Sequence, residues 1–115
     1  MLTQRYVEDI LVIDGYDDID IQRMEEIKNI ISSQIERRKY KVVLNLEKTE
    51  HINYSGIEML VERLFRVRDY HGDIKLAGVN DYLRNIFIIA GAFDQFKSYD
   101  SVENAVEGFG KEGRD

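Results

Sequence analysis

The chain has 115 residues and a formal net charge of −6, and it contains no cysteine and no proline. This length fits one compact domain, and an apolar fraction of 43% supplies enough material for a hydrophobic core. The missing cysteines exclude disulfides and thiol nucleophiles, and two histidines are too few for the usual zinc sites. The acidic balance argues against a nucleic-acid partner, because phosphate binding depends on clustered Lys and Arg. No apolar run is long enough for a signal peptide or a transmembrane helix, so we expect a cytoplasmic protein with no membrane insertion.

The first half of the chain alternates between strand and helix patterns. Short apolar runs at Leu2–Val7 and Ile10–Ile13 predict a hairpin, and the polar stretch at 14–18 predicts a loop. Apolar residues at helical spacing predict a helix from about Gln22 to Arg38. The continuous, β-branched apolar run Lys41–Leu46 predicts a buried central strand.

The second half continues this alternation. Its predicted elements are a helix from Ser55 that ends before Gly72, a strand at Ile74–Val79, a helix at Asp81–Ala90 terminated by Gly91, an extended piece ending at Tyr99 and a helix at Ser101–Val106. The glycine-rich end has nothing to pack, so we expect one domain over residues 1–108 and a disordered tail over residues 109–115. The alternation predicts an α/β fold with parallel strand pairing and an antiparallel hairpin at one edge.

The acidic residues before the first predicted helix raise the question of a divalent cation site. They crowd one predicted loop and are Asp14, Asp17, Asp18 and Asp20. The order of a Ca²⁺ loop and its terminal glutamate are missing, so we favour a solvated acidic loop and expect no metal. Neither histidine has a Ser or Asp partner at a recognisable catalytic spacing, and we expect no catalytic residue.

The segment between the central strand and the second helix carries the most informative residue. Ser55 is followed three residues later by Glu58, which is the spacing of a helix capping box. One interpretation is that Ser55 only caps a helix, which contributes about 1 kcal/mol. The other is that Ser55 accepts a phosphate, because free amides and the positive end of the dipole at a helix N-terminus stabilise added negative charge. Both interpretations stay open at the level of local sequence.

Over nearly its whole length, the chain resembles the STAS domains, and among them the bacterial anti-sigma factor antagonists. The resemblance lies in segments that follow the family's order and spacing: Asp17–Ile21, Val42–Leu46 followed by His51–Ile57, Leu76–Val79, the helix end at Ala90-Gly91, and Phe96–Glu103. It implies a small mixed, mostly parallel sheet of four to five strands with an N-terminal antiparallel hairpin. It also implies about four helices packed mainly on one face of that sheet.

The resemblance implies a binding module and not an enzyme. In the family, the unphosphorylated antagonist binds an anti-sigma factor that is also a serine kinase, and a sigma factor is released. The kinase phosphorylates the serine before the motif glycine, which abolishes binding, and a serine phosphatase restores it. By position, the phospho-acceptor here is Ser55, and the residues expected to contact the partner are Asp18, Asp20, Asn53, Tyr54, Gly56 and Ile57. We expect no cofactor, since the partner kinase would bind the ATP, and a monomer or weak homodimer.

Two residues of the motif depart from the family pattern. Asn53 replaces an aspartate and lacks its charge, and Tyr54 replaces a small residue. If the missing carboxylate orients the hydroxyl or assists phosphate transfer, this chain is a slow substrate or none. The departures support an alternative, a STAS adaptor or scaffold subunit (stressosome-like or transporter-associated) that serine phosphorylation does not regulate. A third hypothesis, a small enzyme or ligand carrier of similar architecture, lacks a catalytic constellation.

The third predicted helix is more apolar than one buried stripe requires. Leu83, Ile86 and Ala90 can share a core-facing side. Phe87 and Ile88 follow at successive steps of about 100° around the axis, so we expect one of them to reach solvent. We therefore add Phe87 and Ile88 to the residues expected to bind a partner, as a docking or self-association patch. The alternative is that a neighbouring loop or the last helix covers them.

Overall fold

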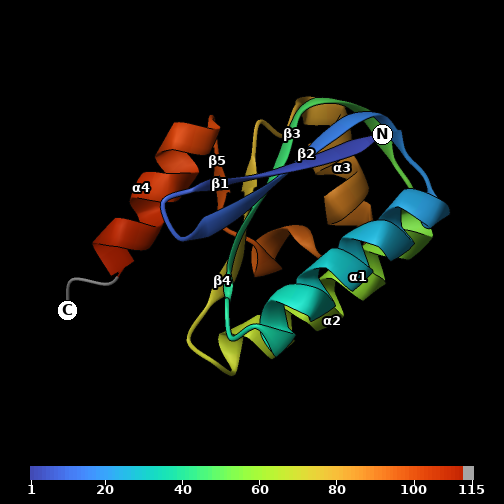
Figure 1. The fold of residues 1–115 in the computed structure, drawn as a ribbon. Helices are drawn as coiled ribbons and strands as arrows, with labels where there is room; N and C mark the ends of the chain where they lie inside the picture. Colours follow the sequence, from blue (N-terminus) through green and yellow to red (C-terminus); the bar gives the residue numbers. More distant parts are fainter. Residues whose placement is uncertain (113–115) are drawn as a thin grey trace.

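A five-stranded sheet organises the computed structural model, which describes residues 1–112 (Figure 1). The elements are, in chain order, β1 (Leu2–Val7), β2 (Ile10–Ile19), α1 (Ile21–Glu36), β3 (Lys41–Ile52), η1 (Tyr54–Gly56), α2 (Ile57–Arg68), β4 (Asp73–Ala77), α3 (Asp81–Ile89), η2 (Phe93–Gln95), β5 (Ser98–Tyr99) and α4 (Val102–Glu112). The labels η1 and η2 denote short 3₁₀ turns. The predicted alternation of strands and helices is confirmed.

The strands lie in the order β1-β2-β3-β4-β5. β1 and β2 form an antiparallel hairpin in which Val7 pairs with Ile10, and each later neighbouring pair is parallel. Parallel neighbours need a crossover between them, and α1, α2 and α3 supply the three crossovers. The prediction of a mixed, mostly parallel sheet with an N-terminal antiparallel hairpin is therefore confirmed.

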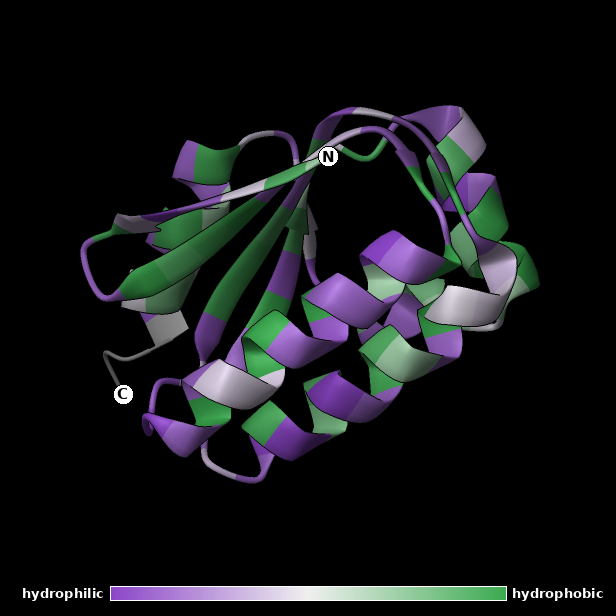
Figure 2. Cartoon of the chain, turned by 45° about the vertical axis from the view of Figure 1, so that its right-hand side comes forward, coloured by the Kyte–Doolittle hydropathy of each residue, from purple (hydrophilic) through white to green (hydrophobic). Residues whose placement is uncertain are grey.

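Helices cover both faces of this sheet. α1, α2 and α3 bury their apolar sides against one face, which includes Leu11 and Leu44. Val12 follows Leu11 and Val43 precedes Leu44, and because side chains alternate along a strand, both valines point to the opposite face. There they pack against α4. In Figure 2 the strands are mainly hydrophobic between the two helix layers, whereas the helices mix hydrophobic and hydrophilic residues. The expected packing of helices mainly on one face is confirmed, with α4 as the exception.

The acidic segment before α1 belongs to a strand, so the prediction of a loop at 14–18 is wrong. β2 continues to Ile19 and β3 continues to Ile52, because the two strands pair with each other through this stretch. The ladder uses backbone groups and therefore tolerates polar side chains. Its register shifts twice, and Asp17, with a φ of 56°, sits at the second irregularity.

The last helix is longer than predicted. Val102, Ala105 and Phe109 recur at i, i+3 and i+7, and they pack on the sheet as one apolar stripe. Gly108 allows close contact with Tyr99, because a Cβ at this position would lie 2.5 Å from the tyrosine hydroxyl. A disordered tail from residue 109 is therefore wrong for residues 109–112, and residues 113–115 lie outside the described part of the chain.

Candidate functional site

Ser55 lies in a short turn where the chain leaves the sheet and enters α2. The last bond of the β2–β3 ladder joins the Asn53 amide to the Ile19 carbonyl at 2.8 Å. The next three residues form the 3₁₀ turn η1, and the regular helix begins only at Ile57. The Ser55 side chain is exposed in the middle of this turn. A modifying enzyme could therefore reach its hydroxyl without unfolding the chain.

The turn is capped by Asn53 and not by Ser55, so the predicted capping box with Glu58 is wrong. The Asn53 side-chain oxygen accepts a hydrogen bond from the Gly56 amide at 3.2 Å, and the Asn53 carbonyl accepts from the same amide at 3.1 Å. Asparagine is among the best N-cap residues, and the inserted 3₁₀ turn moves the cap two residues earlier. The capping function is therefore met by Asn53, and the Ser55 hydroxyl takes no part in it.

The residues after Ser55 anchor the turn in the core. Gly56 packs on Met24 of α1 so closely that a Cβ at this position would lie 2.4 Å from the methionine Cγ. Ile57 is buried in the main core. Gly56 and Ile57 therefore hold Ser55 in place, and the expectation that they offer a surface to a partner is wrong. Tyr54, which is 54% exposed, does offer such a surface.

The acidic residues lie beside this turn at the end of the neighbouring strand. Asp18 is the register partner of His51, and Asp20 follows Ile19, whose carbonyl binds Asn53. Asp20 also caps α1, accepting a hydrogen bond from the Arg23 amide at 2.8 Å. Both aspartates are exposed. The carboxyl ends of β2 and β3 thus bring Asp18 and Asp20 to the same end of the sheet as Ser55.

The structure shows which of the many apolar residues of α3 are buried and which are exposed. Phe87 is fully buried and packs edge-on against Phe96, with ring centroids 5.8 Å apart, so its predicted role as a surface contact is wrong. Ile88 is 50% exposed, which confirms the prediction that one of the two residues Phe87 and Ile88 reaches solvent. Ile89, which sequence reasoning missed, is 72% exposed. A count of helical steps from Phe87 would have identified Ile89 once the buried side of α3 was known.

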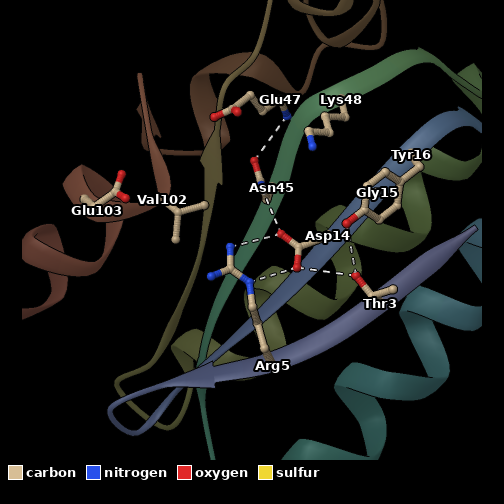
Figure 3. A pocket seen from close by; sticks show the side chains of 10 residues that line it. All are labelled: Thr3, Arg5, Asp14, Gly15, Tyr16, Asn45, Glu47, Lys48, Val102 and Glu103. Carbon is tan, nitrogen blue, oxygen red and sulfur yellow. Dashed lines mark hydrogen bonds and ion pairs between the residues drawn. The ribbon is translucent and has the colours of Figure 1, made fainter.

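A polar hollow of about 430 Å³ lies on the other face of the sheet, near the start of α4 (Figure 3). Asp14 stands at its centre and is 7% exposed. The Arg5 guanidinium donates to both Asp14 carboxylate oxygens, at 2.9 and 3.2 Å, and the Asn45 amide donates to one of them at 2.8 Å. Thr3 adds a weaker contact at 3.5 Å. The network joins three neighbouring strands, since Thr3 and Asn45 are the register partners of Asp14.

The charges in this network stabilise each other. Burial tends to raise the pKa of Asp14, but hydrogen bonds from Arg5 and Asn45 outweigh burial and hold the pKa below its usual value. The hydrogen bond to Asp14 correspondingly raises the pKa of Arg5. Because Asp14 already receives bonds from three side chains, we regard the network as a structural link between strands and keep the Ser55 turn as the candidate functional site.

Two kinds of feature are absent from residues 1–112. No three His, Cys, Asp or Glu side chains in this range are grouped so that they could hold a metal ion. In the same range, no helix is both long and apolar enough to cross a membrane.

The sequence model of the STAS domain family matches residues 3–105. BtrV of Bordetella bronchiseptica, a candidate anti-sigma factor antagonist, is 21% identical over 108 residues, which cover 94% of this chain and 93% of BtrV. The match therefore extends over almost the full length of both proteins.

Solved structures share the fold at low sequence identity. The anti-sigma factor antagonist SpoIIAA in its unphosphorylated form gives a TM-score of 0.85 at 18% identity, covering 96% of this chain and 97% of that one. SpoIIAA of Bacillus in its phosphorylated form gives 0.76 at 18% identity, covering 95% and 99%. A sulfate transporter family protein of Wolinella succinogenes gives 0.74 at 15% identity, covering 88% and 84%. These likenesses confirm the predicted fold.

Proposed function

This chain belongs to the STAS domain family, and we propose that it is an anti-sigma factor antagonist switched by phosphorylation of Ser55. Unphosphorylated, it binds an anti-sigma factor that is also a serine kinase, and a sigma factor is released. Phosphorylation ends this binding, and a serine phosphatase restores it. The protein acts in the cytoplasm and performs no catalysis of its own. The ATP for the switch is bound by the partner.

The observation that carries the proposal is the placement of Ser55. Its hydroxyl is exposed, while Asn53 and Gly56 on either side fix the backbone through a cap and a close contact with α1. A kinase can therefore bind the turn in one defined conformation. The family relatives BtrV and SpoIIAA support the assignment, and SpoIIAA has been solved in both phosphorylation states.

In the phosphorylation step, this chain supplies only the Ser55 hydroxyl. The Ser55 Oγ forms a bond to the γ-phosphorus of the partner's ATP, the bond to ADP breaks, and the hydroxyl proton passes to a base of the kinase or to water. The product carries about −1.5 to −2 added charge. In a packed interface this charge must be desolvated, and it lies at the same sheet end as Asp18 and Asp20, which repel it. Binding is lost without any change in the core.

The decisive experiment is phosphorylation by a purified anti-sigma factor kinase. After incubation with ATP, intact mass should rise by one phosphoryl group, and peptide mapping should place it on Ser55. The matched control is the Ser55→Ala variant. Its intact mass should not change on incubation with the kinase and ATP, and it should still bind the kinase. Ser55→Asp should weaken that binding by at least about tenfold. An unmodified wild-type chain, or undiminished binding by Ser55→Asp, contradicts the switch.

Asn53 favours one second candidate function. Its side-chain oxygen is engaged with the Gly56 amide, and its amide cannot act as the base that a carboxylate could provide. A STAS adaptor that is not controlled at serine would use the same surface for constant binding, as a scaffold or beside a transporter. The sulfate transporter family neighbour is consistent with such a role. The Asn53→Asp variant separates the two, because a gain of phosphorylation would indicate that the native residue has weakened the switch.

A further inference from the structure

The sheet ends in two edges that differ in how well they are protected. At one edge, β5 is only two residues long, from Ser98 to Tyr99. At the other edge, β1 is six residues long, from Leu2 to Val7, and it is the outermost strand on that side of the sheet (Figure 1). A short edge strand offers little to pair with, whereas a long one presents a row of free backbone groups. β1 is therefore the edge at which another strand could be added.

The backbone of β1 alternates between groups that bond to β2 and groups that point outward. The Met1 carbonyl accepts a hydrogen bond from the Tyr16 amide at 3.2 Å, which makes these two residues a hydrogen-bonded pair. Hydrogen-bonded and non-hydrogen-bonded pairs alternate along an antiparallel ladder, so every second residue after Met1 also bonds to β2, as far as Val7 at the hairpin turn. The residues that direct their amide and carbonyl groups away from β2 are therefore Leu2, Gln4 and Tyr6.

Within residues 1–112, none of the usual devices blocks this edge. The chain has no proline, and the register between β1 and β2 runs without a bulge from Leu2 to Val7. Arg5 is the only charged residue of the strand, and Asp14 holds its guanidinium on the α4 face at 2.9 Å. Lys39 lies over the Tyr6 ring, 4.8 Å from its centre, on the α1 face. Both charges therefore lie to the sides of the sheet and leave the edge free for pairing.

We propose that β1 pairs with β1 of a second copy of this chain, so that two five-stranded sheets join into one. A two-fold axis makes the two strands antiparallel and closes the assembly at two copies. With the axis at Gln4, this residue faces Gln4 of the other copy, and Leu2 faces Tyr6. Each of these pairs exchanges two backbone hydrogen bonds. The inference does not depend on the proposed switch at Ser55.

The side chains on the α1 face suit this arrangement. Leu2 packs against the main core, and the Tyr6 hydroxyl donates to Gln34 of α1 at 3.0 Å, so both side chains point to that face. In the joined sheet, Leu2 of one copy lies opposite Tyr6 of the other, and Tyr6 is 46% exposed in the single chain. Apolar and aromatic neighbours across a strand pair stabilise it. The pairing therefore removes apolar surface from water in both copies.

Charge selects this register among the symmetric ones. With the axis at Gln4, Arg5 faces Thr3 of the other copy, and each Arg5 keeps its own Asp14. A shift of the pairing by two residues toward the hairpin turn would set Arg5 directly opposite Arg5 of the other copy, which is unfavourable for like charges. A shift in the other direction leaves Tyr6 without a partner residue in β1. Only the register centred on Gln4 pairs all the outward residues without opposing like charges.

The edge uses no residue of the candidate site. β1 pairs with β2 only as far as Gly15, whereas the stretch of β2 beside the Ser55 turn runs from Asp17 to Ile19 and pairs with β3. A dimer joined through β1 therefore carries the Ser55 turn twice, once in each copy.

Hydrogen exchange of the full chain tests the surface. Sedimentation equilibrium from about 10 μM to about 1 mM should show monomer and dimer in equilibrium. As the dimer forms, exchange should slow by at least about tenfold at the outward amides of Leu2, Gln4 and Tyr6. The matched controls already bond to β2 in one copy and should change by less than about twofold; they are the amides of Thr3, Arg5 and Val7. A monomer at every concentration, or a dimer without this alternation, overturns the proposal.

Charge exchange at Gln4 tests the register. Gln4 is exposed, so a charged side chain is accommodated there without loss of the fold. Gln4→Lys and Gln4→Glu each set like charges against each other across the axis, and each variant should dimerise about fivefold more weakly than the wild type. An equimolar mixture of the two variants should recover the wild-type affinity, because Lys then faces Glu. No recovery in the mixture overturns the pairing of Gln4 with Gln4.

The control for charge exchange is the same pair of changes at Gln22. This residue is exposed on α1, outside the edge, and dimerisation of Gln22→Lys and Gln22→Glu should stay within about twofold of the wild type. Losses at Gln22 equal to those at Gln4 would mean that net charge, and not the β1 edge, governs association, which also overturns the proposal.

The other possible occupant of the edge is an extended segment of the partner kinase. If the chain alone stays monomeric and the outward amides become protected only when the kinase is added, the edge binds the partner and the proposal is wrong. Ser55→Ala should dimerise like the wild type, because the pairing uses β1 only. A dimer that behaves as described in a chain that is not phosphorylated at Ser55 would overturn the switch and leave the β1 pairing in place.

Discussion

At the scale of single residues, the site combines an exposed hydroxyl with buried neighbours. Ser55 is exposed, Gly56 is buried against Met24, and Ile57 is part of the core. Asn53 holds the other side of the turn through the Gly56 amide. The backbone is therefore rigid where the side chain is free. A charge added to Ser55 changes what a partner meets and leaves the packing beneath it in place.

Asp14 supports a pH prediction at the same scale. Its pKa is held low in the folded chain, so its contribution to stability is present above the unfolded pKa of about 3.9 and is lost as pH falls through the folded pKa. Asp14→Asn removes the charged bonds from Arg5, whose side chain is 50% exposed, and should cost about 1 kcal/mol at pH 7. Urea unfolding at several pH values should show the difference from wild type shrinking below about pH 4.

The control for this prediction is the exposed pair Asp9–Lys41. The two groups lie 3.4 Å apart, and the Asp9 side chain is 72% exposed. Asp9→Asn should change the free energy of unfolding by less than about 0.5 kcal/mol at any pH tested. A difference for Asp14→Asn that stays constant from pH 7 to pH 3 would mean that ionisation of Asp14 contributes nothing.

At the scale of elements, α4 has a different task from the other helices. α1, α2 and α3 form the face that carries the candidate site, whereas α4 closes the opposite face of the sheet. There it covers Val12 and Val43, and Phe109 also lies over the fully buried Lys75, whose ammonium is 4.7 Å from the ring centroid. By covering this face of the sheet, α4 contributes to the stability of the fold.

Phe109 tests this division between the helices. It is 6% exposed, so Phe109→Ala should lower the free energy of unfolding by about 3 kcal/mol. Phe65→Ala is the matched control, because Phe65 is 49% exposed on α2 and should cost less than about 1 kcal/mol. Guanidinium unfolding curves measure both. Similar losses for the two variants would show that the last turns of α4 are not packed on the sheet.

At the scale of the whole molecule, the fold was predictable where the information is local. Apolar runs located the β1–β2 hairpin and the start of β3, and Gly91, with a φ of 71°, ends α3 as predicted. The continuation of β2 and β3 was not predictable, because it depends on pairing between segments far apart in sequence, such as Tyr16 with Lys48. Neither segment has the apolar pattern that indicates a strand.

The candidate site was predictable in position and less so in detail. The sequence located Ser55 at the entrance of a helix, but it could not choose between Ser55 and the nearby Asn53 as the cap, since both residue types cap helices well. On α3 it could not fix which apolar residue faces outward, because that depends on how the helix is rotated against the sheet. A single step along the chain separates buried Phe87 from exposed Ile88.

A negative charge at Ser55 can weaken partner binding in two ways, by repelling the partner or by destabilising the fold. Variants at the neighbouring positions 55 and 56 distinguish the two. Ser55→Asp should change the free energy of unfolding by less than about 0.5 kcal/mol, because the side chain is exposed and takes no part in capping the turn. Gly56→Ala should cost about 2 kcal/mol, because its Cβ would meet Met24. Urea unfolding measures both under the buffer conditions used for partner binding. Equal destabilisation by the two variants would mean that Ser55→Asp weakens binding by disturbing the core, whereas the expected contrast attributes the loss of binding to charge alone.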